Sequence, residues 1–146
     1  MIVALLFWGL LLACCGFASA YGGWAGRAVS LAYLLAVLAT IPASLVDTDW
    51  SDPQLAVLGV DAALLAALIW TALRSDRWFP VWFAGFHLVA VISHVASILA
   101  PGYAAKVYFI FQSIWTVPML MTLVIGVARD RHARITDGPP REAHAR

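Results

Sequence analysis

Charged residues are scarce in this 146-residue chain: they make up 12% of it, whereas 63% of the residues are apolar and the mean hydropathy is +0.87. A soluble domain is nearer half apolar and about a quarter charged. One small core cannot bury so large an apolar excess, because a short chain leaves much of its surface exposed, and this indicates a lipid environment. The net charge of +1 argues against a nucleic-acid partner, since nucleic-acid-binding proteins carry a basic face.

Sequence motifs of common enzymes are absent as well. The chain has no Walker loop, no G-x-S-x-G and no C-x-x-C, which mark nucleotide-binding, hydrolytic and redox sites. Its two cysteines, Cys14 and Cys15, are adjacent, and neighbouring residues on a helix point about 100° apart. They are poorly placed for a disulfide, and we interpret them as small apolar residues.

Five apolar runs are present, each close to the roughly 20 residues that a helix needs to cross the hydrocarbon core of a bilayer. They cover residues 2–20, 28–46, 53–73, 79–100 and 103–128. We therefore predict an all-α integral membrane bundle of about five transmembrane helices in residues 1–128. Residues 129–146, rich in arginine, proline and polar residues, are expected to form a disordered cytoplasmic tail.

The basic residues predict the orientation of this bundle. Eight of the nine fall on one side of a five-crossing chain: in the tail, between the first two runs, and between the third and fourth. Because cytoplasmic loops are rich in lysine and arginine, we expect the N-terminus outside and the C-terminus inside. The alternative is a signal peptide, since Ala18-Ser19-Ala20 fits a cleavage site. No basic residue precedes this apolar run, and cleavage would leave the eight basic residues outside, so we prefer the first interpretation.

Polar residues inside the apolar runs are candidates for function, because they are costly in lipid. An ionised Asp61 at the bilayer centre would cost about 2.5–3.5 kcal/mol. With a rise of about 1.5 Å per residue, Thr40, Asp61, His94 and Gln112 lie about 9–14 Å below the outer surface on four different helices. His87 shares a helix face with His94 and lies about two turns deeper. These five residues form a candidate ligand or proton site.

Three interpretations of these residues are open. In the first they are only packing contacts between helices, worth about 0.6 kcal/mol each. In the second, Asp61 and His94 exchange protons or bind a ligand, since a carboxylate–imidazole pair can change its protonation near neutral pH. In the third, Asp61 faces a partner subunit, because its helix face carries leucines while the small residues Gly59 and Ala63 face the other way.

The sequence indicates no cofactor or metal. His87 and His94 lie on one helix about 10.5 Å apart along its axis, so they cannot both ligate one haem iron. The spacing of Asp61 and His94 matches no recognised metal-binding pattern. Haem is therefore disfavoured.

The stretch from Asp76 to His87, together with Ser93-His94 and Ser113-Ile114-Trp115, is similar to a group of small proteobacterial inner-membrane proteins with no assigned activity. The similarity covers roughly the C-terminal half of the chain. It implies a helical, multi-pass protein of the bacterial inner membrane and transfers no functional residue.

We therefore expect a non-enzymatic accessory or scaffold subunit of an inner-membrane complex. Its expected partners are the lipid bilayer and other membrane subunits or further copies of itself. One alternative is a transporter or proton-conducting component that uses Asp61 and His94. Another is a haem-binding redox enzyme or a lipid-modifying membrane enzyme.

Overall fold

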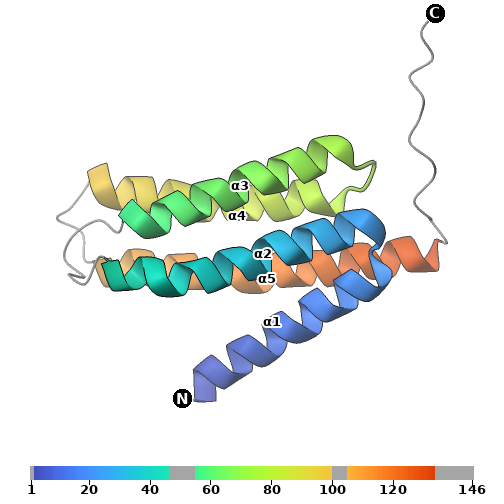
Figure 1. The fold of residues 1–146 in the computed structure, drawn as a ribbon, viewed down its shortest axis with the longest axis horizontal. Helices are drawn as coiled ribbons and strands as arrows, with labels where there is room; N and C mark the ends of the chain where they lie inside the picture. The colour runs from blue at the N-terminus through green and yellow to red at the C-terminus, as the bar shows by residue number, and fades with distance from the viewer. Residues whose placement is uncertain (1, 47–54, 100–104, 134–146) are drawn as a thin grey trace, which may run out of the picture.

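A computed structural model of the protein describes residues 2–46, 55–99 and 105–133. These residues form five helices: α1 (Ile2–Tyr21), α2 (Gly23–Val46), α3 (Leu55–Arg74), α4 (Phe79–Leu99) and α5 (Ala105–His132). Each helix packs on the next one along the chain, and α1 also packs on α5, so the helices form a closed ring. Successive helices run in opposite directions (Figure 1). The all-α prediction is confirmed.

The outside of this bundle is apolar. Leu31, Leu35 and Leu38 of α2 are each more than half exposed, whereas soluble proteins rarely expose large apolar patches. Within the described ranges, three helical segments are long and apolar enough to cross a membrane, and α1 contributes a shorter apolar helix. These three segments are Gly23–Leu45, Leu55–Arg74 and Phe79–Ala96. Length and surface together indicate a membrane protein.

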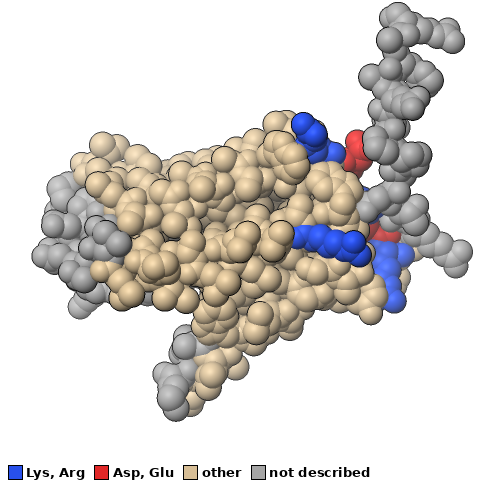
Figure 2. All heavy atoms as spheres, viewed as in Figure 1, with Lys and Arg blue, Asp and Glu red and all other residues tan. Residues whose placement is uncertain are grey.

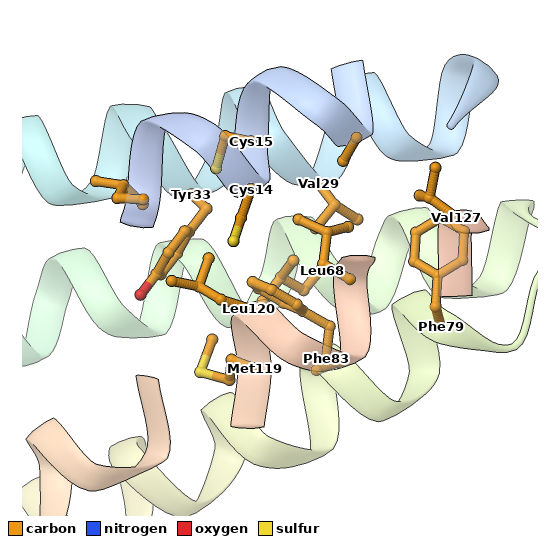
Figure 3. Packing of buried hydrophobic residues seen from close by; sticks show 14 of the residues in the cluster. Cys14, Cys15, Val29, Tyr33, Leu68, Phe79, Phe83, Met119, Leu120 and Val127 are labelled. Carbon is orange, nitrogen blue, oxygen red and sulfur yellow. The ribbon is translucent and has the colours of Figure 1, made fainter. Parts of the chain in front are cut away.

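Buried apolar side chains from all five helices meet in one core (Figure 3). Phe79 and Phe83 of α4 are fully buried. The Phe83 ring meets the Tyr33 ring of α2 edge to face, with ring centroids 5.4 Å apart. The Phe79 ring lies against Gly126 of α5, where even a Cβ atom would collide with it. A glycine thus allows α4 and α5 to approach closely.

A tight corner joins α1 to α2. The amide of Gly22 donates a hydrogen bond to the Ala18 carbonyl at 2.8 Å, and Gly23 has a positive φ of 61°, a conformation that glycine adopts without strain. A Cβ at Gly22 would lie 2.5 Å from the Ala18 oxygen, so the corner needs glycine for space too. From this corner the N-terminal half of α1 diverges from the other four helices (Figure 1).

Two helices extend four or more residues beyond the predicted boundaries. α2 begins at Gly23, whereas the predicted apolar run begins at residue 28. α5 continues to His132, so residues 129–132 are helical and the prediction of a disordered tail from residue 129 is wrong for them. The physical reason is that an apolar run marks the part of a helix suited to hydrocarbon, and helical hydrogen bonding continues through polar residues beyond it. Residues 53, 54 and 134–146 of the predicted ranges lie outside the described residues.

Candidate functional site

The α3 helix positions Asp61 on its buried face. Asp61 is 8% exposed, and Val57, Leu64 and Leu68, one to two turns away on the same face, are buried as well. The leucine-lined face is therefore the one that packs in the bundle, and Asp61 points at α4. The interpretation that Asp61 faces a partner subunit is not supported by this orientation.

The small residues of α3 lie on the opposite, outer face. Gly59 and Ala63 are exposed, although small residues are typical of helix contacts in membranes. The reason is volume: a five-helix ring encloses a centre that large side chains must fill, because interiors are packed to near crystal density. Alanine on the outer face is apolar and costs little there. The small-residue rule therefore indicated the wrong face of α3.

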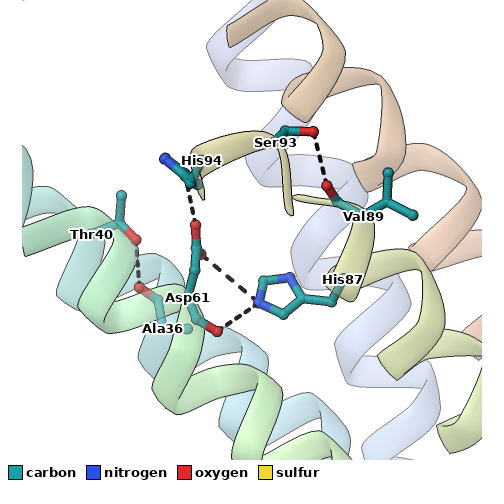
Figure 4. Close-up of polar contacts among 7 residues, drawn as sticks. All are labelled: Ala36, Thr40, Asp61, His87, Val89, Ser93 and His94. Carbon is teal, nitrogen blue, oxygen red and sulfur yellow. Dashed lines mark hydrogen bonds and ion pairs between the residues drawn. The ribbon is translucent and has the colours of Figure 1, made fainter. Parts of the chain in front are cut away.

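The Asp61 carboxyl group pairs with His94 of α4. Atom Oδ2 of Asp61 lies 2.9 Å from Nε2 of His94, and the two side chains are only 12% and 11% exposed. Figure 4 shows the two groups pointing at each other between α3 and α4. The expected Asp61–His94 contact is thus present. The matched depth of the two residues in antiparallel neighbouring helices was the signal that predicted it.

His87 also reaches Asp61, but mainly through the main chain. Its Nε2 atom lies 3.0 Å from the Asp61 carbonyl oxygen and 3.9 Å from the carboxylate Oδ1 (Figure 4). A carbonyl oxygen only accepts hydrogen bonds, so Nε2 of His87 carries the hydrogen and donates it. The carbonyl has a second lone pair for its helical hydrogen bond. His87, which the depth count places about two turns deeper than His94, therefore contacts Asp61 as well.

Helix geometry explains how one aspartate contacts two histidines. A side chain on an α-helix tilts toward the N-terminus of the helix, whereas the carbonyl groups point toward its C-terminus. On α3 the carboxyl group of Asp61 is therefore displaced toward one end of the bundle and its carbonyl oxygen toward the other. His94 and His87, about 10.5 Å apart along α4, lie at these two levels. A count of residue depth, which uses one position per residue, misses this second contact.

Of the other two candidate residues, the structure describes the side chain of Thr40, which bonds within its own helix. The Thr40 hydroxyl donates a 2.9 Å hydrogen bond to the Ala36 carbonyl of its own helix (Figure 4). Ser93 does the same with Val89 at 2.8 Å. Such local bonds satisfy a hydroxyl in lipid without a partner helix. Gln112 lies on α5, and its side chain is outside the part of the chain whose side chains the structure describes.

A second polar contact was not predicted from the sequence. Nη1 of Arg77, in the α3–α4 connection, lies 2.7 Å from Oδ2 of Asp130 on α5, and both side chains are largely buried. The prediction assigned Asp130 to the disordered tail. The available signal was helical spacing, since Asp130 continues the buried stripe formed by Leu123 and Val127. This ion pair fastens the α3–α4 connection to the end of α5.

Within the described ranges, no group of three or more His, Cys, Asp and Glu residues is arranged to hold a metal ion. Cys14 and Cys15 are buried free thiols. The cluster consists of one acid and two imidazoles, with His94 at the Asp61 carboxyl group and His87 at the Asp61 main-chain carbonyl. This arrangement can hold and exchange protons.

No protein-family model, curated protein or solved structure compared with the chain matches it. We therefore infer the function from the geometry of Asp61, His87 and His94.

Proposed function

We propose that the chain crosses a bacterial inner membrane five times, with its N-terminus outside and its C-terminus in the cytoplasm. The distribution of charge supports this orientation. Figure 2 shows the basic side chains gathered at the end of the bundle where α3 and α5 end, while uncharged side chains cover the helices on the visible face. The arginines of the described residues that lie at this end are Arg27, Arg74, Arg77, Arg129 and Arg131.

We further propose that the protein is a proton-exchanging component of this membrane. The observation that carries the proposal is the 2.9 Å contact between Asp61 Oδ2 and His94 Nε2 inside the bundle. A charge in a low-dielectric interior is costly unless it is paired, so the pair favours states in which a proton lies between the two atoms. Intramembrane chains of acidic residues and histidines are typical of proton relays in pumps and transporters.

The two nitrogens of His94 supply a route for the proton. With an ionised Asp61, Nε2 of His94 carries a hydrogen that it donates to Oδ2. A proton that binds Nδ1, the nitrogen turned away from Asp61 (Figure 4), converts His94 to an imidazolium ion. The Nε2 proton then moves to Oδ2, which leaves a neutral imidazole beside a carboxylic acid. One proton has entered at Nδ1 and one has reached Asp61.

In this scheme His87 is a positioning residue. Its hydrogen bond to the Asp61 carbonyl joins α4 to α3 at the main chain of Asp61 itself. Its ring, 3.9 Å from Oδ1, also provides a polar neighbour for the carboxylate in an apolar interior. A scaffold that needed only helix packing would gain little from this arrangement, since apolar residues of similar volume often pack as stably as a buried ion pair.

The second candidate is the non-enzymatic accessory or scaffold subunit. The exposed leucines of α2 favour it, because they provide an apolar face on which the helices of a partner can pack. The two candidates differ in what they require of Asp61 and His94. A scaffold keeps its function when Asp61 and His94 are replaced by side chains that cannot exchange protons. A proton-exchanging component loses its function in that case.

The test is proton uptake by vesicles that contain the purified protein, a trapped pH-sensitive dye and an imposed potassium diffusion potential. We expect uptake with the native chain and a fall to the protein-free rate for Asp61→Asn and for His94→Gln. Thr40→Ala is the matched control, because its hydroxyl bonds within its own helix at a similar depth, and it should conduct like the native chain. Uptake that survives Asp61→Asn contradicts the proposal and favours the scaffold.

A second measurement detects proton exchange even without transport. Infrared difference spectra between acidic and alkaline buffer should contain a carboxylic-acid band that Asp61→Asn removes. Asp130→Asn, at the arginine-rich end of the bundle, should leave that band in place. Absence of any such band in the native chain would show that Asp61 does not change its protonation.

A further inference from the structure

We infer that the arginine-rich end of the bundle binds the phosphate groups of anionic phospholipids through guanidinium groups stacked on aromatic rings. This inference depends on the proposed placement in a membrane and is independent of proton exchange at Asp61. Three arginine–aromatic pairs at this end carry it.

The three pairs come from different helices. The Arg74 guanidinium lies 5.1 Å from the centre of the Trp70 ring on α3. Arg129 of α5 lies 5.9 Å from the Trp78 ring, just before α4. Arg131 lies 4.1 Å from the ring of Tyr21, where α1 ends. All three distances are within the range of cation–π attraction, about 6 Å.

Stacking leaves the edge of each guanidinium available. A guanidinium is planar, so when its face lies on a ring its N–H groups point outward in the plane. These N–H groups form the fork that matches two oxygens of a phosphate. Stacking also holds a long side chain in place, so less side-chain entropy is lost when a phosphate binds.

The charge balance at this end favours an anion. Arg77 is neutralised by Asp130. Arg27, Arg74, Arg129 and Arg131 are exposed, and the exposed acidic residue among the described residues near them is Asp76. Figure 2 shows the resulting concentration of basic groups.

A lipid headgroup fits this surface better than a free anion. Trp24 and Trp70, which meet edge to face at 6.5 Å, are exposed beside Arg74. Tryptophan is typical of the level at which headgroups meet acyl chains. A phospholipid whose phosphate is held there by arginine can extend its acyl chains along the exposed leucines of α2. Free phosphate gains no such contact. The occupant is therefore an anionic phospholipid such as phosphatidylglycerol.

The experiment is native mass spectrometry of the full chain in detergent with phosphatidylglycerol or phosphatidylcholine added. We expect phosphatidylglycerol to bind in preference, and the combined variant Arg74→Gln, Arg129→Gln, Arg131→Gln to weaken it by about fivefold per arginine. The combined Arg→Lys variant keeps the charge and should still bind more weakly than the native chain. Lys106→Gln changes the charge at the start of α5 and should bind like the native chain.

Several outcomes overturn the inference. Equal binding of both lipids shows that no phosphate site exists, and full binding by the Arg→Lys variant shows that the stacked fork is not needed. Displacement by inorganic phosphate at the concentration of the lipid indicates a simple anion site. A chain that does not enter detergent micelles contradicts the membrane placement itself. The Asp61→Asn variant should bind phosphatidylglycerol like the native chain. A failure of the proton-exchange proposal can therefore be distinguished from a failure of the lipid-binding inference.

Discussion

Asp61 contacts two histidines with two different groups, its carboxyl oxygen and its main-chain carbonyl. Only the first contact depends on the identity of the side chain, because every residue has a carbonyl. His87 would therefore keep its hydrogen bond in Asp61→Asn, and His94 would keep a neutral partner in the asparagine amide. This variant tests protonation with little loss of structure.

Gly126 provides the sharpest prediction at the residue scale. A Cβ there would collide with the buried Phe79 ring, and forcing extra volume into a packed core costs about 1–3 kcal/mol. We expect Gly126→Ala to lower the thermal unfolding temperature of the purified protein in detergent. Gly85→Ala on α4 is the matched control, because nothing lies within 4 Å of its added Cβ. It should be neutral or stabilising, since alanine favours helix by about 1 kcal/mol. Equal effects of the two substitutions would contradict the close approach of α4 and α5.

At the scale of the helix, the ends carry contacts that the apolar runs do not include. Arg27, in the first turns of α2, donates from Nε to the Ser19 carbonyl near the end of α1 at 3.2 Å. Asp130, in the last turn of α5, pairs with Arg77. These polar ends join neighbouring helices where the bundle meets the proposed interface.

Two truncations should therefore behave differently. Truncation after Arg131 keeps Asp130 and should leave membrane insertion and yield unchanged. Truncation after Ala128 removes Asp130 and with it the largely buried ion pair to Arg77. A hydrogen bond to a charged group is worth about 1.5–3 kcal/mol, so we expect a lower unfolding temperature for the shorter chain. Asp130→Asn in the full chain should reproduce much of this loss, and its failure to do so would assign the effect to another part of the last turn.

At the scale of the whole molecule, the ring of alternating helices and the arginines at one end support a single orientation. We predict that a fluorescent protein fused to the C-terminus is fluorescent and that a phosphatase fused there is inactive, because the proposed orientation puts the C-terminus in the cytoplasm. An active phosphatase would contradict the five-crossing orientation and would favour the signal-peptide alternative. The same fusions after Arg27 should give the same result, since the first turns of α2 lie at the same end of the bundle.

Composition and run length by themselves determined the helix class, the number of helices and their approximate positions. The physical reason is local: a backbone in lipid must satisfy its hydrogen bonds within its own segment, so an apolar run of sufficient length becomes a helix whatever surrounds it. Depth along each helix is also local, and it predicted that Asp61 and His94 lie at one level, though not that they face each other. The polar ends of the helices were harder to predict, because hydropathy does not show where helical hydrogen bonding stops. Residues 129–132, which are helical, illustrate this.

The tertiary structure alone decided how each helix is rotated about its axis. Rotation depends on which side chains of other helices fill the centre, and those side chains are distant in sequence. It turned the leucine face of α3, with Asp61, inward and Gly59 outward. It brought His87 to the Asp61 carbonyl, left Thr40 bonded within its own helix, and placed Gly126 against Phe79. Because the His87–Asp61 and Gly126–Phe79 contacts join residues far apart in the chain, no periodic pattern within a single run could specify them.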